Sequence, residues 1–138
     1  MKESVPSPSP DDSSTTIRFM RQKIEAFVHE RDWKQFHNPK DLATAIAIEA
    51  AELMELFLWK TEGEIRGELT DHLAKQRIAQ ELSDIFILCL SFANQLDIDV
   101  TQAFLAKIEH NAAKYPVHKV RGRSEKYTQY QDDESKRM

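Results

Sequence analysis

The chain has 138 residues, a usual size for one domain, and its formal net charge at pH 7 is -4. This mildly acidic balance lacks the basic surface that marks nucleic-acid binding proteins. The longest apolar run is shorter than the roughly 18 residues of a membrane-spanning helix. The single cysteine, Cys89, excludes an internal disulfide and favours a reducing, cytoplasmic location.

Helical periodicity begins after a serine- and proline-rich start. A first helix is predicted over about 15–31, because apolar side chains recur there at helical spacing after several N-cap candidates. Residues 31–37 lack a regular period and predict a loop or short turn. Asn38 and Pro39 then form a clear helix start, with asparagine as N-cap and proline at the first helical position. The second helix is expected over about 39–60.

Two further helices are predicted after a charged connector. Residues 61–69 contain two glycines and many charges, which is typical of a connector, although a small inserted helix is compatible with them. A third helix is expected over about 71–96, with apolar residues that include Leu82 and Cys89 on its buried face. A fourth helix follows over about 100–113, and Pro116 ends it.

The composition favours an all-α protein. Helix-forming residues dominate positions 17–114, and the whole chain has only three glycines. We therefore expect a four-helix bundle at 14–118, between a disordered N-terminal tail at 1–13 and a C-terminal tail at 119–138 that is first basic and then acidic. Cys89 has apolar neighbours, so we expect its thiol to be buried.

Four carboxylates stand out within the apolar helical patterns. Glu49 and Glu52 lie three residues apart in the second helix, and Glu81 and Asp84 have the same spacing in the third. Antiparallel packing of these helices would bring the two pairs face to face. A charge in such surroundings is costly unless it meets a partner, which favours a metal site over the alternative of a solvated acidic face.

The donor set narrows the identity of the metal. Di-iron bundles use glutamate followed three residues later by histidine, and the sequence contains no such pair. Zinc favours cysteine and histidine, but Cys89 is isolated and the histidines have no ligand spacing. Carboxylate oxygens alone favour Mg²⁺, with Mn²⁺ as a substitute.

At this point several ordered motifs resemble those of one family. The two acid pairs, the stretch 31–39 (RDWKQFHNP), the stretch 52–60 (ELMELFLWK) and the stretch 107–116 (KIEHNAAKYP) together cover most of residues 17–127. They resemble the MazG-like, all-α nucleoside triphosphate pyrophosphohydrolases, and the dCTP pyrophosphatase branch in particular.

The resemblance implies hydrolysis of (deoxy)nucleoside triphosphates, dCTP or related dNTPs, to a monophosphate and pyrophosphate. It makes Glu49, Glu52, Glu81 and Asp84 both the metal ligands and the catalytic acids. Glu55 is a further candidate, either for activating water or as a plain surface glutamate. The implied substrate-binding residues are Trp33, His37, Trp59, Leu88, Lys107, Asn111 and Lys114. The family also implies a homo-oligomer, either a dimer or a tetramer built from dimers.

Two departures from the family pattern affect the expected specificity. Animal relatives have tyrosine where Leu88 stands and histidine where Ile24 aligns, so this chain is expected to accept several deoxynucleotides.

Two other interpretations of the function stay open. One is a phosphoribosyl-ATP pyrophosphohydrolase-like enzyme, and the other is a catalytically silent helical interaction module.

Overall fold

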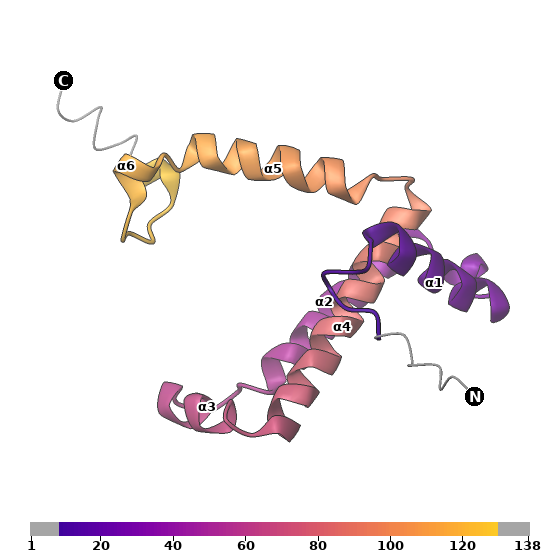
Figure 1. Cartoon of the computed structure of the whole chain (residues 1–138), viewed down its shortest axis with the longest axis horizontal. Helices are drawn as coiled ribbons and strands as arrows, with labels where there is room; N and C mark the ends of the chain where they lie inside the picture. The colour runs from indigo at the N-terminus through magenta and orange to yellow at the C-terminus, as the bar shows by residue number, and fades with distance from the viewer. Residues whose placement is uncertain (1–8, 130–138) are drawn as a thin grey trace, which may run out of the picture. The chain divides into compact units, whose positions relative to one another are not determined.

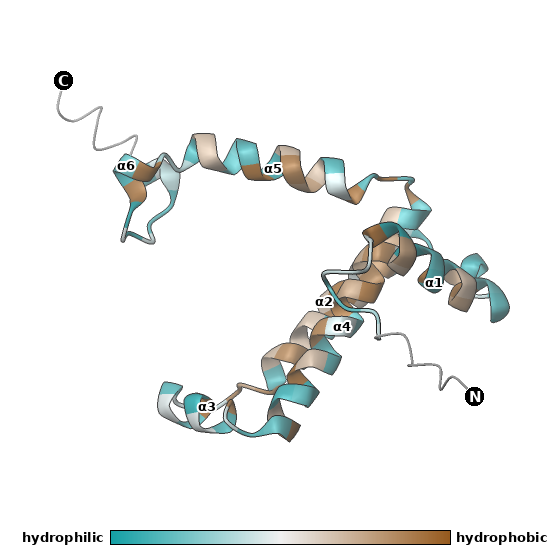
Figure 2. Cartoon of the chain, in the orientation of Figure 1, coloured by the Kyte–Doolittle hydropathy of each residue, from teal (hydrophilic) through white to brown (hydrophobic). Residues whose placement is uncertain are grey.

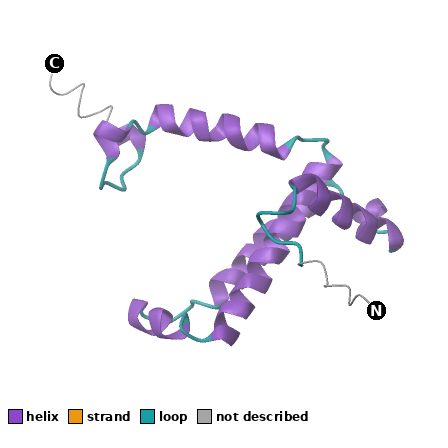
Figure 3. Cartoon of the chain, viewed as in Figure 1, coloured by secondary structure: helices purple, strands orange, loops and turns teal. Residues whose placement is uncertain are grey.

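The computed structural model describes residues 9–129, which form helices joined by turns (Figure 1, Figure 3). The predicted all-α class is therefore confirmed for this part of the chain. The outer portions of both predicted tails, residues 1–8 and 130–138, lie outside it. The chain divides into two compact units, Met1–Ile98 and Asp99–Met138. Within 9–129, no helix is both long enough and apolar enough to cross a membrane.

The first unit is built around one antiparallel helix pair. Helix α2 packs along α4, and α1 packs against α4 as well (Figure 1). The elements of this unit are α1 (Ile17–Glu30), the 3-10 turn η1 (Lys34–Phe36), α2 (Pro39–Glu55), α3 (Glu62–Glu68) and α4 (His72–Gln95). The second unit contains α5 (Val100–Lys114) and α6 (Val117–Val120).

The helix starts follow the capping residues in the sequence. The Asn38 side chain accepts a hydrogen bond from the Asp41 amide at 2.9 Å, with Pro39 in the first turn of α2. This bond satisfies one of the amides that a helix N-terminus leaves without a partner, and proline supplies no such amide. Side-chain caps also begin the other three long helices, at Thr16, Asp71 and Asp99.

Helix α2 ends earlier than its apolar period predicts. Its last residue is Glu55 rather than residue 60, and the backbone then tightens into turns with three-residue hydrogen bonds. Trp59 follows at φ 63°, in the left-handed region that bulky residues rarely adopt. The small helix that the connector allowed is present as α3, which begins with a capping box between Thr61 and Glu64.

Few apolar side chains are buried in the described part of the first unit. The buried apolar side chains are Leu42, Ala74, Leu90 and Ala93. The predicted burial of Leu82 and Cys89 is wrong, because Leu82 is 55% exposed and Cys89 is exposed too. Helix α4 carries many apolar residues (Figure 2), and several of them, including Leu73, Leu82 and Phe86, stay exposed although α1 and α2 pack against this helix.

Polar contacts fix α1 and the η1 segment against the C-terminal end of α4. The Arg21 guanidinium donates to Asn94 Oδ1 and to the Ile98 carbonyl, each at 2.7 Å. Asn94 returns a bond from its Nδ2 to the Arg21 carbonyl at 3.2 Å, and the Gln95 amide donates to the carbonyl of His37. The carbonyl of Ile98, in the turn after α4, thereby gains a side-chain donor from α1.

Candidate metal centre

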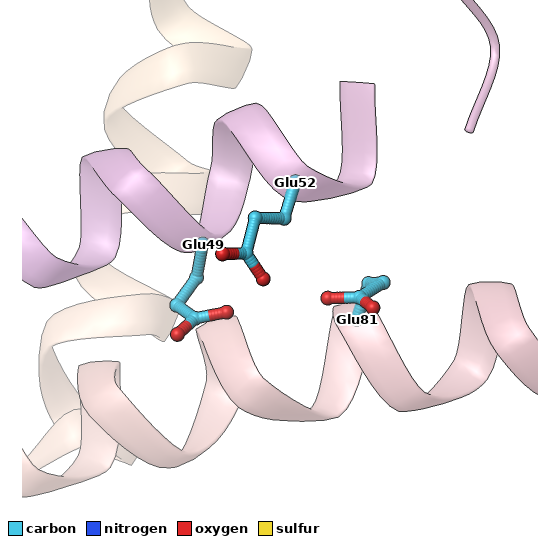
Figure 4. A group of neighbouring side chains, drawn as sticks. All are labelled: Glu49, Glu52 and Glu81. Atoms are coloured by element: carbon cyan, nitrogen blue, oxygen red, sulfur yellow. The ribbon is translucent and has the colours of Figure 1, made fainter. Parts of the chain in front are cut away.

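Three carboxylates converge between α2 and α4. Glu49 and Glu52 extend from α2 and Glu81 extends from α4, and one oxygen of each lies within 4.8 Å of the other two (Figure 4). The three-residue spacing puts both α2 acids on one face, and the antiparallel pairing places the α4 acid opposite them. The structure thus brings together three of the four acids predicted as ligands.

Two of these carboxylates are only partly exposed. Glu49 and Glu81 are partly buried, whereas Glu52 is exposed. The Oε2 atoms of Glu49 and Glu81 are buried, and no described residue donates a hydrogen bond to either atom. Buried polar atoms are nearly always satisfied, because an unpaired one costs free energy. Two orphaned carboxylate oxygens in one acidic cluster therefore indicate a place for a cation.

The cluster raises the proton affinity of its own members. Partial burial, followed by the charges of Glu52 and Asp84, raises the pKa of Glu49 above its ordinary value of 4.5. The pKa of Glu81 is raised for the same reasons in the same order. In the described part of the chain, no lysine, arginine or histidine forms an ion pair with Glu49, Glu52 or Glu81. All-oxygen donors with this charge suit a divalent metal ion.

Asp84 and Glu55 lie at the margin of the cluster. Asp84 is exposed and does not belong to the group whose oxygens lie within 4.8 Å of one another, yet its charge raises the pKa of both Glu49 and Glu81. Glu55 is the last residue of α2, and its charge contributes to the raised pKa of Glu81. Both acids thus add to the negative charge around the cluster.

The predicted base-binding residues of the first unit differ in their surroundings. Trp59 is 93% exposed just beyond the end of α2. Trp33 packs edge-on against Phe27, with ring centroids 5.7 Å apart, and remains 45% exposed. Leu88 lies one turn after Asp84 on α4 and is half-buried. Neither tryptophan is thus a plain core residue in the isolated chain.

The predicted phosphate-binding residues lie in the second unit. Lys107, Asn111 and Lys114 follow one another along one face of α5. The Lys114 ammonium lies 4.9 Å from the centroid of the Tyr127 ring. Their role toward the acids of the first unit stays a prediction.

Sequence reasoning missed one cavity in the first unit. It has a volume of about 80 Å³ and lies between α1, the η1 segment and α4. Its lining includes His37, which was predicted to contact substrate, and also Glu25 and Ser91, which were not. The available signal was Ser91 itself, a hydroxyl inside the most apolar run of the chain.

Comparison with known proteins links the chain to one group of enzymes. The sequence profile of the MazG-like family matches residues 44–130. Bovine dCTP pyrophosphatase 1 is 39% identical over 116 residues, which cover 84% of this chain and 69% of the relative. The human protein of the same name is 38% identical over 114 residues, covering 83% and 67%. Among solved structures, a pyrophosphatase from Archaeoglobus fulgidus is 29% identical, with a TM-score of 0.68 over 78% of this chain and 99% of that chain.

Proposed function

Because this chain belongs to the MazG-like family, we propose that it is a nucleoside triphosphate pyrophosphohydrolase that acts on dCTP and related dNTPs. It cleaves between the α and β phosphates and releases a nucleoside monophosphate and pyrophosphate. The observation that carries this proposal is the group of three convergent carboxylates, with two buried oxygens that lack hydrogen-bond donors.

The donor set fits Mg²⁺. Mg²⁺ binds oxygen ligands at about 2.0–2.1 Å. One oxygen from each of the three carboxylates lies within 4.8 Å of the other two, so small side-chain adjustments would let all three hold one ion. Glu49, Glu52 and Glu81 would hold the metal, and Asp84 would complete the set when its side chain turns inward.

The acids prepare the site for a strongly negative substrate. Without a cation, four carboxylates would repel a triphosphate, so substrate binding and metal binding are coupled. Mg²⁺ held by Glu49, Glu52 and Glu81 would supply positive charge beside the phosphates and would make a nearby water molecule more acidic. Glu55, at the end of α2, is the acid that we assign to orienting this water, since it lies beside the cluster without belonging to it.

The exposed tryptophans supply surfaces for the nucleotide base. Trp59 holds a left-handed backbone conformation at φ 63° while its side chain is 93% exposed. Such strain persists where a residue is needed in one position, and an exposed indole can stack on a base. We assign Trp33, His37 and Leu88 to the same side of the substrate, and Lys107, Asn111 and Lys114 to the phosphates.

A second copy of the chain would cover the remaining apolar surface. In the first unit Met54 is 71% exposed, Leu73 63% and Leu82 55%. Exposed apolar side chains of this size are common at contacts between subunits when they lie together. We therefore propose a homodimer or a tetramer of dimers, measurable by sedimentation velocity. A cytoplasmic location, which the single free cysteine favours, is part of the same proposal.

The test is pyrophosphate release from a panel of dNTPs with Mg²⁺. Turnover of dCTP that requires the metal would support the proposal. Turnover of phosphoribosyl-ATP alone would move the chain to the other enzymatic interpretation. Absence of turnover on both substrates would leave the silent helical module.

A further inference from the structure

Trp59 has a strained backbone conformation that its own side chain does not explain. Its φ of 63° lies in the left-handed region, and its indole is 93% exposed. Within residues 9–129 the indole forms no hydrogen bond and packs against no other aromatic ring. Strain of this kind persists only where the surrounding structure fixes it. The conformation of Trp59 is therefore held by its neighbours in the chain and not by packing of the indole.

The residues that follow Trp59 are fixed by a series of polar contacts. The Lys60 amide donates to the Phe57 carbonyl at 3.2 Å, which closes a turn around Trp59. Thr61 then begins α3 with its capping box. The Glu64 amide donates to Thr61 Oγ1 at 3.3 Å, and the Thr61 amide donates to the Glu64 carboxylate at 2.7 Å. The start of α3 thus lies two residues after Trp59 and has a defined geometry.

An ion pair joins this turn to the other end of α3. The Lys60 ammonium lies 2.7 Å from Glu68 Oε2, and Glu68 is the last residue of α3. The Glu68 carbonyl accepts a hydrogen bond at 2.9 Å from the amide of Asp71, the N-cap of α4. Ile65 is the one residue of α3 that is even partly buried, so packing holds this helix weakly. The ion pair therefore ties the neighbour of Trp59 to the start of α4, the helix that supplies one acid of the cluster.

We propose that Lys60 and Glu68 are positioning residues, whose ion pair holds the Trp59 indole in place for stacking on the substrate base. This inference rests on the proposed pyrophosphohydrolase function, in which Trp59 contacts the base. The two charges act on the substrate through Trp59, because each already has the other as its partner. An exposed ion pair contributes little to the free energy of unfolding of a domain. It can still raise the fraction of molecules in which one turn has the binding conformation.

The kinetic experiment measures kcat and KM for dCTP with Mg²⁺ in Lys60→Met and Glu68→Gln. Each change should raise KM by about two- to fivefold, which corresponds to the loss of one exposed ion pair, and should leave kcat unchanged because the metal-binding acids are intact. Lys60→Arg keeps the positive charge and should keep the wild-type KM. Glu62→Gln breaks the other ion pair of α3, which Glu62 forms with Arg66, and is the matched control with wild-type constants.

The fluorescence of Trp59 tests its positioning without any substrate. The chain has two tryptophans, so Trp33→Phe leaves Trp59 as the single reporter. In this background Lys60→Met and Glu68→Gln should lower the fluorescence anisotropy of Trp59, because the indole then moves more freely, whereas Glu62→Gln should not. All three changes should leave the melting temperature within about 3 °C of the background protein, because the ion pairs are exposed.

The outcomes separate this inference from the proposed function. Unchanged anisotropy in both Lys60→Met and Glu68→Gln would overturn the inference and leave the proposed function standing. A raised KM in Lys60→Met alone would overturn it too, because the ammonium would then act on the substrate directly and not through its pair with Glu68. Absence of turnover by the wild type on every dNTP would overturn the proposed function, and with it the role of Trp59 in base stacking.

Discussion

Replacement of Glu81 by glutamine should affect stability in opposite directions with and without Mg²⁺. Glu81 contributes a buried, orphaned oxygen, and its pKa is raised by partial burial and by the neighbouring acids. In EDTA at neutral pH, Glu81→Gln should therefore melt at a higher temperature than the wild type, because one like charge leaves the cluster. With Mg²⁺ the order should change, because the variant has lost a ligand.

The size of the metal effect follows from linkage. At a Mg²⁺ concentration 100 times its dissociation constant, binding stabilises the native wild type by about 2.7 kcal/mol. Loss of a supporting group near a metal already weakens binding by about 10- to 100-fold, so loss of one of three direct ligands should cost at least that much. At the same Mg²⁺ concentration the variant should gain about 1.4 kcal/mol or less. Each kcal/mol moves the melting temperature of a domain of this size by about 3–6 °C.

The assay is differential scanning fluorimetry over a Mg²⁺ titration. Glu109→Gln, an exposed glutamate on α5, is the matched control and should melt and respond as the wild type does. Equal Mg²⁺-induced shifts in Glu81→Gln and the wild type would refute the reasoning, because the carboxylate would then not contact the ion. A lower melting temperature for Glu81→Gln in EDTA would refute the claim that like charges oppose each other in the free site.

Three further outcomes follow from the same structure. The pKa values of Glu49 and Glu81 are raised in the folded chain above the ordinary value of 4.5, so the folded chain binds more protons than the unfolded chain between the two values. In EDTA, their contribution to the free energy of unfolding should therefore decrease as pH rises through this window. Urea titrations should show this decrease, and saturating Mg²⁺ should reverse it. Arg21→Met should lower the free energy of unfolding by about 2–4 kcal/mol through loss of charge-assisted bonds to the end of α4, and Arg21→Lys should lose less. Trp59→Ala should raise the KM for dCTP, because the indole is proposed to stack on the base. The melting temperature should stay within about 1 °C of the wild type, because an indole that is 93% exposed contributes almost no packing. A large drop in melting temperature would contradict the role in base stacking.

The sequence was most informative where local chemistry decides the structure. Asn38 with Pro39 and Asp99 marked helix starts because capping depends on a few neighbouring residues, and each lies where it was expected. The acid pairs could be placed opposite each other for a similar reason. A charge at an apolar position needs a partner, and the short connector before α4 favours an antiparallel pair.

Tertiary packing decided what the sequence could not. The apolar period of α2 continues through Leu56 and Phe57, and no glycine or proline marks the end of the helix at Glu55. The burial of Cys89 was mispredicted because α4 is apolar on several sides, and its sequence does not say which side faces α1 and α2. The cavity lined by Ser91 was missed for the same reason, since it forms only when α1 and the η1 segment pack against α4.

The most direct test of catalysis by the carboxylate cluster is pyrophosphate release from dCTP with Mg²⁺, measured for the wild type beside Glu49→Gln. The metal-site mechanism predicts turnover by the wild type and a loss of at least 100-fold in kcat/KM for the variant, which keeps the shape of the side chain but removes a charged ligand. The melting temperature of the variant in EDTA should be equal to or above that of the wild type. Wild-type turnover that persists undiminished in Glu49→Gln would contradict the mechanism, because the cluster would then not hold the catalytic metal.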